Sequence, residues 1–374
     1  MTKIRLILIS LLLAVFALPA VASDAGSADS GSTKIDPKAI IFEHLGDGYG
    51  WEVPFDHHHR IPLPVIVYAS DGFHCFSSSH ITHGETYDDG GCTFRIAPED
   101  SKYKGKVVEI IDGEEVRPWD FSVTKNVCAL FITVLIVSGL LLWLAAFLRR
   151  NPYKAPRKGL GAVEVCVTFV YDGVIKPILG PQARRFAPYL LSVFFFILVM
   201  NLMGLIVIFP GGANLTGNIA VTLVLSICTF LVTNIFANRH YWKEIFWPDV
   251  PLWLKFPIPI MPVIEIFGMF TKPAALTVRL FANMMGGHMI VITLTLLIFI
   301  FSAIAPVAGG AATVVSLIFS IFMLLIDTLV SFIQAYVFTM LSAIFIGIAQ
   351  EQPHEAHGHE TAAEVGKQIE DTLV

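Results

Sequence analysis

The chain has 374 residues; 55% of them are hydrophobic, only 15% are charged, and the formal net charge is −5. This composition is more apolar than a soluble domain needs to fill its core, so it excludes an ordinary soluble enzyme and indicates a membrane protein. The acidic balance gives no reason to expect a nucleic-acid partner.

Residues 1–22 have the pattern of a secretory signal peptide. Lys3 and Arg5 precede the apolar run LILISLLLAVFAL, and Ala20 and Ala22 then form an A-x-A cleavage site. The alternative is an uncleaved anchor helix, for which the run is short, since a span needs about 20 residues.

Charge is distributed unevenly along the chain. Residues 23–120 contain 18 acidic and 8 basic residues, a net charge of −10, whereas residues 149–185 contain 8 basic and 2 acidic residues, a net charge of +6. Basic loops favour the cytoplasmic side of a membrane. We therefore expect residues 23–120 to form an exported, extracytoplasmic (periplasmic) extension.

The extension carries two cysteines and a group of histidines. Cys75 and Cys92 form a candidate disulfide in an oxidising compartment, and two free thiols are the alternative. The spacing of the histidines does not match a closed tetrahedral zinc site, so we expect neither a metal nor a cofactor.

Apolar runs of membrane-helix length predict about five membrane-inserted segments, at 124–148, 187–209, 219–237, 258–303 and 312–348. The last two exceed the length of a perpendicular span, so they must tilt strongly, break or extend beyond the bilayer. If the first segment runs from outside to inside, the number of crossings places the tail, residues 351–374, in the cytoplasm.

Four formally charged residues lie between 258 and 348: Glu265, Lys272, Arg279 and Asp327. A charge at the bilayer centre costs at least about 2.5–3.5 kcal/mol, so each is expected to be functional or paired. Lys272 lies near the inner end of its segment, where a long cationic side chain is expected to reach the interface.

Helical spacing sorts these side chains onto faces. Asn283 lies about 40° from Arg279 around the helix, and Glu265 lies about 40° to the other side, so the three share one face. His288 lies about 180° from Arg279 and faces elsewhere. On the final helix, Asp327 and Gln334 are about 20° apart and ~10 Å apart along the axis.

This set of residues suits proton passage. Imidazole and buried carboxyl groups exchange protons near neutral pH, whereas arginine keeps its proton and can only attract an anion or repel a cation. The structural alternative is an intramembrane ion pair, such as Arg279 with Asp327, that only fixes helix packing.

The two final segments resemble the a subunit of the F-type ATP synthase. The likeness rests on KPAALTVRLFANMMGGH followed about fifty residues later by SFIQAYVFTMLSAIFIG, and it includes GANLTGNIAVT and IEIFGMFTKP. It extends from about residue 187 to 350. The chain contains no phosphate-binding glycine loop, so ATP chemistry is expected on other subunits.

The resemblance implies two long tilted helices packed against a rotating ring of c subunits, with b subunits as further partners. It implies that Arg279 faces the ring carboxylates and separates two offset aqueous half-channels. It also implies that Asn283 and Gln334 place the arginine or line the proton route, and that Glu265 belongs to a half-channel.

His288 and Asp327 occupy positions where many members of the family have a glutamate and a histidine, so the acid and the imidazole are exchanged here. The exchange predicts a coupled titrating pair; because aspartate is short, a bridging water is the alternative to direct contact between the two side chains. Asn218 and Thr222 are candidates for lining the outer channel, and helix–helix hydrogen bonding is an equal alternative.

The sequence therefore predicts an all-α membrane protein with about five membrane-inserted helices, two of them long and tilted, plus an exported N-terminal extension. The resemblance implies that residues 121–350 form the proton-translocating domain of a bacterial inner-membrane, non-catalytic subunit. A proton-coupled secondary transporter is the alternative, although no internal repeat supports it.

Overall fold

A computed structural model describes residues 47–53, 56–81, 85–98, 101–111, 113–153, 155–156, 159–206, 212–246, 260–304 and 306–350. The predicted signal peptide, residues 1–22, and the predicted tail, residues 351–374, lie outside the described residues.

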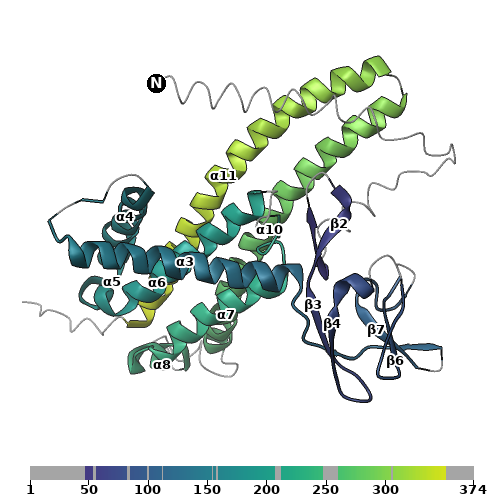
Figure 1. Ribbon diagram of the computed structural model, residues 1–374. Helices are drawn as coiled ribbons and strands as arrows, with labels where there is room; N and C mark the ends of the chain where they lie inside the picture. Colours follow the sequence, from purple (N-terminus) through teal and green to yellow (C-terminus); the bar gives the residue numbers. More distant parts are fainter. Residues whose placement is uncertain are drawn as a thin grey trace, which may run out of the picture. The chain divides into compact units, whose positions relative to one another are not determined.

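The N-terminal extension, for which the sequence predicts no particular secondary structure, is built from strands. The strands of the described extension are β1 (Gly50–Val53), β2 (Asp56–Pro62), β3 (Pro64–Tyr68), β4 (Phe73–Ser77), β5 (Tyr87–Asp89), β6 (Cys92–Ile96), β7 (Val107–Ile111), β8 (Glu114–Val116) and β9 (Trp119–Asp120). They form three antiparallel sheets, ordered β1-β2, β4-β3-β9 and β5-β6-β7-β8 (Figure 1). The strands are only two to seven residues long. The alternation of apolar and polar residues that marks a strand is therefore hard to recognise in this acidic sequence.

Alternating burial explains the core of this extension. In β3, Val65 and Val67 are fully buried while their neighbours are more exposed, and Phe76 on β4 and Phe94 on β6 pack into the same apolar cluster. Successive side chains of a strand point to opposite faces, so one face of each of these strands forms the core.

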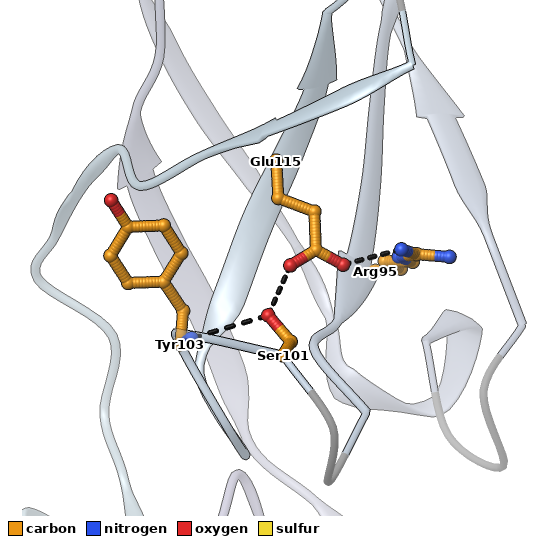
Figure 2. Close-up of polar contacts among 4 residues, drawn as sticks. All are labelled: Arg95, Ser101, Tyr103 and Glu115. Atoms are coloured by element: carbon orange, nitrogen blue, oxygen red, sulfur yellow. Dashed lines mark hydrogen bonds and ion pairs between the residues drawn. The ribbon is translucent and has the colours of Figure 1, made fainter.

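A polar network connects β6 and β8, which lie on either side of β7 in the four-stranded sheet. Arg95 on β6 and Ser101 in the following loop both donate to the Glu115 carboxylate on β8, and the Tyr103 backbone N–H donates to the Ser101 hydroxyl at 3.2 Å (Figure 2). The hydrogen bond from Ser101 and then the neighbouring Arg95 charge lower the pKa of Glu115 below its ordinary value.

The structure forms no disulfide between Cys75 and Cys92; both thiols are free. Cys75 is exposed on β4, whereas Cys92 is buried in the core with its sulfur 4.0 Å from the Ser70 hydroxyl. The two side chains therefore have different environments, one facing outward and one inward.

The helical part of the chain begins at Lys125, shortly after the last strand, β9. Its helices are α3 (Lys125–Arg150), α4 (Gly159–Val170), the π-helical turn η4 (Tyr171–Ile175), α5 (Lys176–Leu179), α6 (Ala183–Leu205), α7 (Ile219–Ile235), α8 (Arg239–Phe246), α10 (Ile260–Ile304) and α11 (Pro306–Gln350). Thr124 caps α3 by accepting a hydrogen bond from the Val127 N–H, and Arg149 and Arg150 lie in its last turn. Cations are favourable at that end of a helix.

Among the described residues, four helices are long and apolar enough to cross a membrane: Lys125–Arg150, Gly159–Leu205, Pro262–Leu294 and Thr313–Gln350. The shorter apolar α7 corresponds to the third predicted segment, 219–237. The second span differs most from the prediction, because helical structure begins at residue 159, whereas the predicted segment begins at residue 187.

The two final helices are unusually long. Each of α10 and α11 contains 45 residues. Such a helix is about 68 Å long, against about 30 Å for the hydrocarbon core of a bilayer. These are the two long helices that the sequence predicts, and they contact each other along the hairpin in Figure 1.

The core of the helical part forms where α6 meets the final hairpin. Leu190, Phe194 and Ile197 of α6 are fully buried and pack in one cluster with Leu280 of α10 and Phe338 of α11. This packing fixes the middle of α10 and α11, which is where the intramembrane polar residues lie.

Candidate proton-pathway site

Arg279 lies on α10 with an exposed side chain. It forms no hydrogen bond or ion pair with any residue that the structure describes, so neither Asp327 nor Glu265 neutralises it. Because α10 is one continuous helix from Ile260 to Ile304, Glu265, Arg279 and Asn283 share a face, as the spacing predicts. The structural alternative of an Arg279–Asp327 ion pair is absent.

One direct polar contact joins α10 to α11 beside this arginine. The Asn283 amide donates to the Gln334 side-chain oxygen at 3.0 Å, and Gln334 is 4% exposed. Asn283 lies one turn from Arg279, so this hydrogen bond holds the two helices in register close to the guanidinium.

His288 is directed toward backbone carbonyls. Its Nδ1 lies 3.1 Å from the Met284 oxygen on its own helix, and its Nε2 lies 3.2 Å from the Gly204 oxygen on α6. Both acceptors are carbonyl oxygens, which donate nothing, so only the imidazolium form donates both hydrogen bonds at once. In the neutral ring, one nitrogen lone pair would face a carbonyl oxygen.

Asp327 packs against the helix turn that carries His288. Its carboxylate lies so close to Gly287 that a Cβ built there would be 2.8 Å from Oδ1 and 2.9 Å from Oδ2. His288 and Asp327 interact electrostatically but form no ion pair or hydrogen bond. The missing side chain of Gly287 is therefore what admits the carboxylate to α10.

Asn201 on α6 is a polar residue that was not among the predicted site residues. Asn201 is fully buried, its amide nitrogen lies 3.5 Å from the Ser331 carbonyl oxygen, and its side-chain oxygen has no hydrogen-bond partner among the described residues. Ser331 in turn donates to the Asp327 carbonyl at 2.7 Å. A lone amide in the apolar run FFFILVMNLMGL was the available signal.

A second polar region surrounds the N-terminal part of α10. Glu265 is half-buried and interacts electrostatically with Tyr241 of α8; burial and then this carboxylate raise the pKa of Tyr241. Lys272 lies with its ammonium 5.5 Å from the centre of the Phe345 ring. A pocket lies beside Lys272; its lining includes the polar residues Ser226, Thr229, Thr233, Asn234 and Tyr241 as well as apolar side chains.

The side chains of Asn218 and Thr222 form hydrogen bonds within the start of α7. The Asn218 side chain caps α7 by accepting from the Ala220 N–H at 3.0 Å, and the Thr222 hydroxyl donates to the Ile219 carbonyl at 3.1 Å. Helix–helix hydrogen bonds from α7 are made instead by Ser226, whose hydroxyl lies 2.6 Å from that of Thr277 on α10, and by Thr229, whose hydroxyl lies 3.0 Å from that of Tyr189 on α6.

The arrangement places titratable groups on both sides of an uncompensated cation. Along α10, Glu265 lies about 21 Å before Arg279 and His288 about 13 Å after it. A fixed guanidinium repels cations and attracts carboxylates, and carboxyl and imidazole groups take up and release protons. The chemistry available here is proton transfer past a fixed positive charge.

Comparisons with known proteins cover both parts of the chain. A family model described as ATP synthase A chain matches residues 127–347, and a model described as a domain of unknown function (DUF8433) matches residues 40–121.

Similar proteins extend over most of the chain. ATP synthase subunit a of Chloroherpeton thalassium is 38% identical over 329 residues, which are 79% of this chain and 91% of that protein. ATP synthase subunit a of Myxococcus xanthus is 38% identical and covers 80% of this chain and 92% of its own length. ATP synthase subunit a 2 of Chlorobaculum tepidum is 41% identical over 259 residues, which are 67% of this chain and 69% of that protein. The chain therefore belongs to the ATP synthase A chain family, the non-catalytic membrane proton-channel subunits of the F-type ATP synthase.

Proposed function

We propose that Arg279 faces the carboxylates of a rotating ring of c subunits and separates two proton half-channels. The observation that carries the proposal is an exposed guanidinium, in the middle of an apolar helix, without a hydrogen-bonding or ionic partner among the described residues. Such a charge is costly in a bilayer unless another chain supplies its counter-ion. A carboxylate on the rotating ring would act as such a counter-ion while it passes Arg279 and would then move away.

The two half-channels follow from the positions of the titratable groups along α10. His288 and Asp327, together with the buried Asn201, line the half-channel on one side of Arg279. Glu265, with the polar pocket beside Lys272, belongs to the other. Asn283 and Gln334 hold α10 and α11 in register between them. Protons then reach the ring from one side and leave from the other, and the fixed charge prevents direct passage.

The same proposal sets the orientation of the chain. The basic residues between 149 and 185 favour the cytoplasmic side of a bacterial inner membrane, so residues 23–120 lie in the periplasm after cleavage of the signal peptide, residues 1–22. The C-terminal tail, residues 351–374, is cytoplasmic. The b subunits anchor this stationary chain while the ring turns. Asn218 and Thr222 shape the start of α7 rather than conduct protons.

The test is replacement of Arg279 in the assembled complex, reconstituted in vesicles. Arg279→Ala is expected to abolish proton-driven ATP synthesis, and Arg279→Lys to restore little of it, because a buried ammonium loses its proton more readily than a guanidinium. The matched control is Arg150→Ala, which removes a cation from the last turn of α3, a position not assigned to either half-channel. If Arg279→Ala assembles and retains coupled synthesis, the arginine acts only in packing and the proposal is wrong.

A further inference from the structure

The sheet formed by β4, β3 and β9 carries large apolar side chains on both faces. One face carries Val65, Val67 and Phe76 into the core. On the opposite face Tyr68 is 47% exposed, Phe73 74%, Trp119 74% and Phe121, which follows β9, 60%. An antiparallel sheet with a solvated face normally places polar side chains there.

The strand register brings these aromatic residues together. Tyr68 pairs with Phe73 on one side and with Trp119 on the other, and the Tyr68 and Phe73 rings are 4.9 Å apart in an edge-to-face arrangement. The Phe121 N–H donates to the Ile66 carbonyl at 2.9 Å, which continues the alignment beyond β9. We call the outward residues Ile66, Tyr68, Phe73, Cys75, Trp119 and Phe121 the aromatic face; none of them is charged.

We propose that the aromatic face lies in the bilayer surface next to the N-terminal end of α3. The chain itself keeps it close, because α3 starts at Lys125, four positions after Phe121. Four residues span at most about 14 Å. The Val123 N–H also donates to the Pro64 carbonyl at 3.1 Å, which ties the lead-in of this membrane helix to β3.

The residue types suit a lipid interface better than a dry protein contact. Trp and Tyr concentrate where a membrane meets water, because the ring is apolar and the polar tip remains hydrated. The Tyr68 hydroxyl and the Trp119 indole N–H form no hydrogen bond within the described part of the chain, so both remain available for headgroups and water. An exposed apolar surface of this kind marks an interaction site.

Cys75 is an exposed natural reporter on the aromatic face. A spin label is attached to Cys75 in the full chain after Cys128, Cys166 and Cys228 are replaced by serine, and the labelled chain is studied in the assembled complex in vesicles. The matched control carries the label at Asp88→Cys on β5, an exposed position in the other sheet, in a chain that also has Cys75→Ser. Collision with oxygen, which dissolves in lipid, and with a water-soluble nickel chelate gives the depth of each label.

The proposal predicts that the Cys75 label collides with oxygen and loses collisions with the nickel chelate relative to the Asp88→Cys label. Trp119→Ser combined with Phe121→Ser is expected to restore nickel collisions while the complex assembles and pumps normally. Equal nickel accessibility at both positions would overturn the proposal. Protection of Cys75 from both reagents would also overturn it, because the face would then be covered by protein: another subunit, a second copy, or residues 1–46 of this chain.

Discussion

Gly287 is the position where the smallest change tests the arrangement of His288 and Asp327. The Gly287→Ala substitution adds one methyl group, which would lie 2.8 Å from Asp327 Oδ1, whereas ordinary van der Waals contact begins at 3.4 Å. The carboxylate must therefore move by about 0.6 Å, the difference between these two distances. Overpacking of this kind costs about 1–3 kcal/mol.

If about 1–2 kcal/mol of that cost is added to the activation free energy of proton transfer, the proton flux falls by about 5- to 30-fold. The measurement is ATP-driven acidification and proton-driven ATP synthesis in vesicles that contain the assembled complex. Alanine favours a helix over glycine by about 0.5–1 kcal/mol, so a weakened α10 would not explain the loss.

The matched control is Gly139→Ala on α3, where an added methyl group would meet no atom within 4 Å. This control is expected to leave the flux unchanged. A fully assembled Gly287→Ala complex with the flux of the unmodified chain would refute the reasoning, because the close approach of Asp327 to α10 would then have no role in proton transfer.

Three further predictions concern the pair His288 and Asp327, the hydrogen bond between Asn283 and Gln334, and the carboxylate of Glu115. His288→Ala and Asp327→Ala are each expected to slow proton flux, and the double variant to be little slower than either, since both act on one route; additive losses would contradict this. Asn283→Leu and Gln334→Leu are expected to show a coupling energy of about 0.5–3 kcal/mol in a double-mutant cycle of complex stability, because they share one hydrogen bond. Since the pKa of Glu115 is lowered in the folded chain, its contribution to stability is present above the ordinary carboxyl pKa of about 4.5 and is lost as the pH falls through the lower folded value. Acidification is therefore expected to speed amide hydrogen exchange in β7 and β8 of the full chain, and Glu115→Gln to remove most of that pH dependence; an unchanged profile would contradict the role of the network in Figure 2.

Helical periodicity predicted the face shared by Glu265, Arg279 and Asn283 because α10 is one uninterrupted helix, in which angular positions follow from spacing alone. The hydrogen bond between Asn283 and Gln334 joins residues of different helices. It could be predicted only with knowledge of how α10 is aligned against α11. Periodicity within one helix carries no information about that register.

The surroundings of His288 and Asp327 depend on atoms that no motif displays. The acceptor of the His288 Nε2 is a backbone carbonyl of Gly204, and the site of the Asp327 carboxylate is created by the missing side chain of Gly287. Neither is encoded by a side-chain type, so both appear only when the helices are packed together.

Two features of the fold were not predicted from the sequence. They are the helix from Gly159 to Val170 and the short strands of the extension. Their structure follows from tertiary contacts, with Val170 and Val174 buried against α6 and the β3 and β6 valine and phenylalanine side chains buried in a second core. Tertiary packing overrides local propensity in both cases.

The most direct test of the central claim is the distance from the Arg279 guanidinium to the nearest carboxylate in a structure of the intact membrane sector. The account predicts a carboxylate of the c ring within about 4–6 Å and no acid of this chain at that distance. A guanidinium paired with Asp327 or Glu265 in that assembly, with no ring carboxylate nearby, would contradict it.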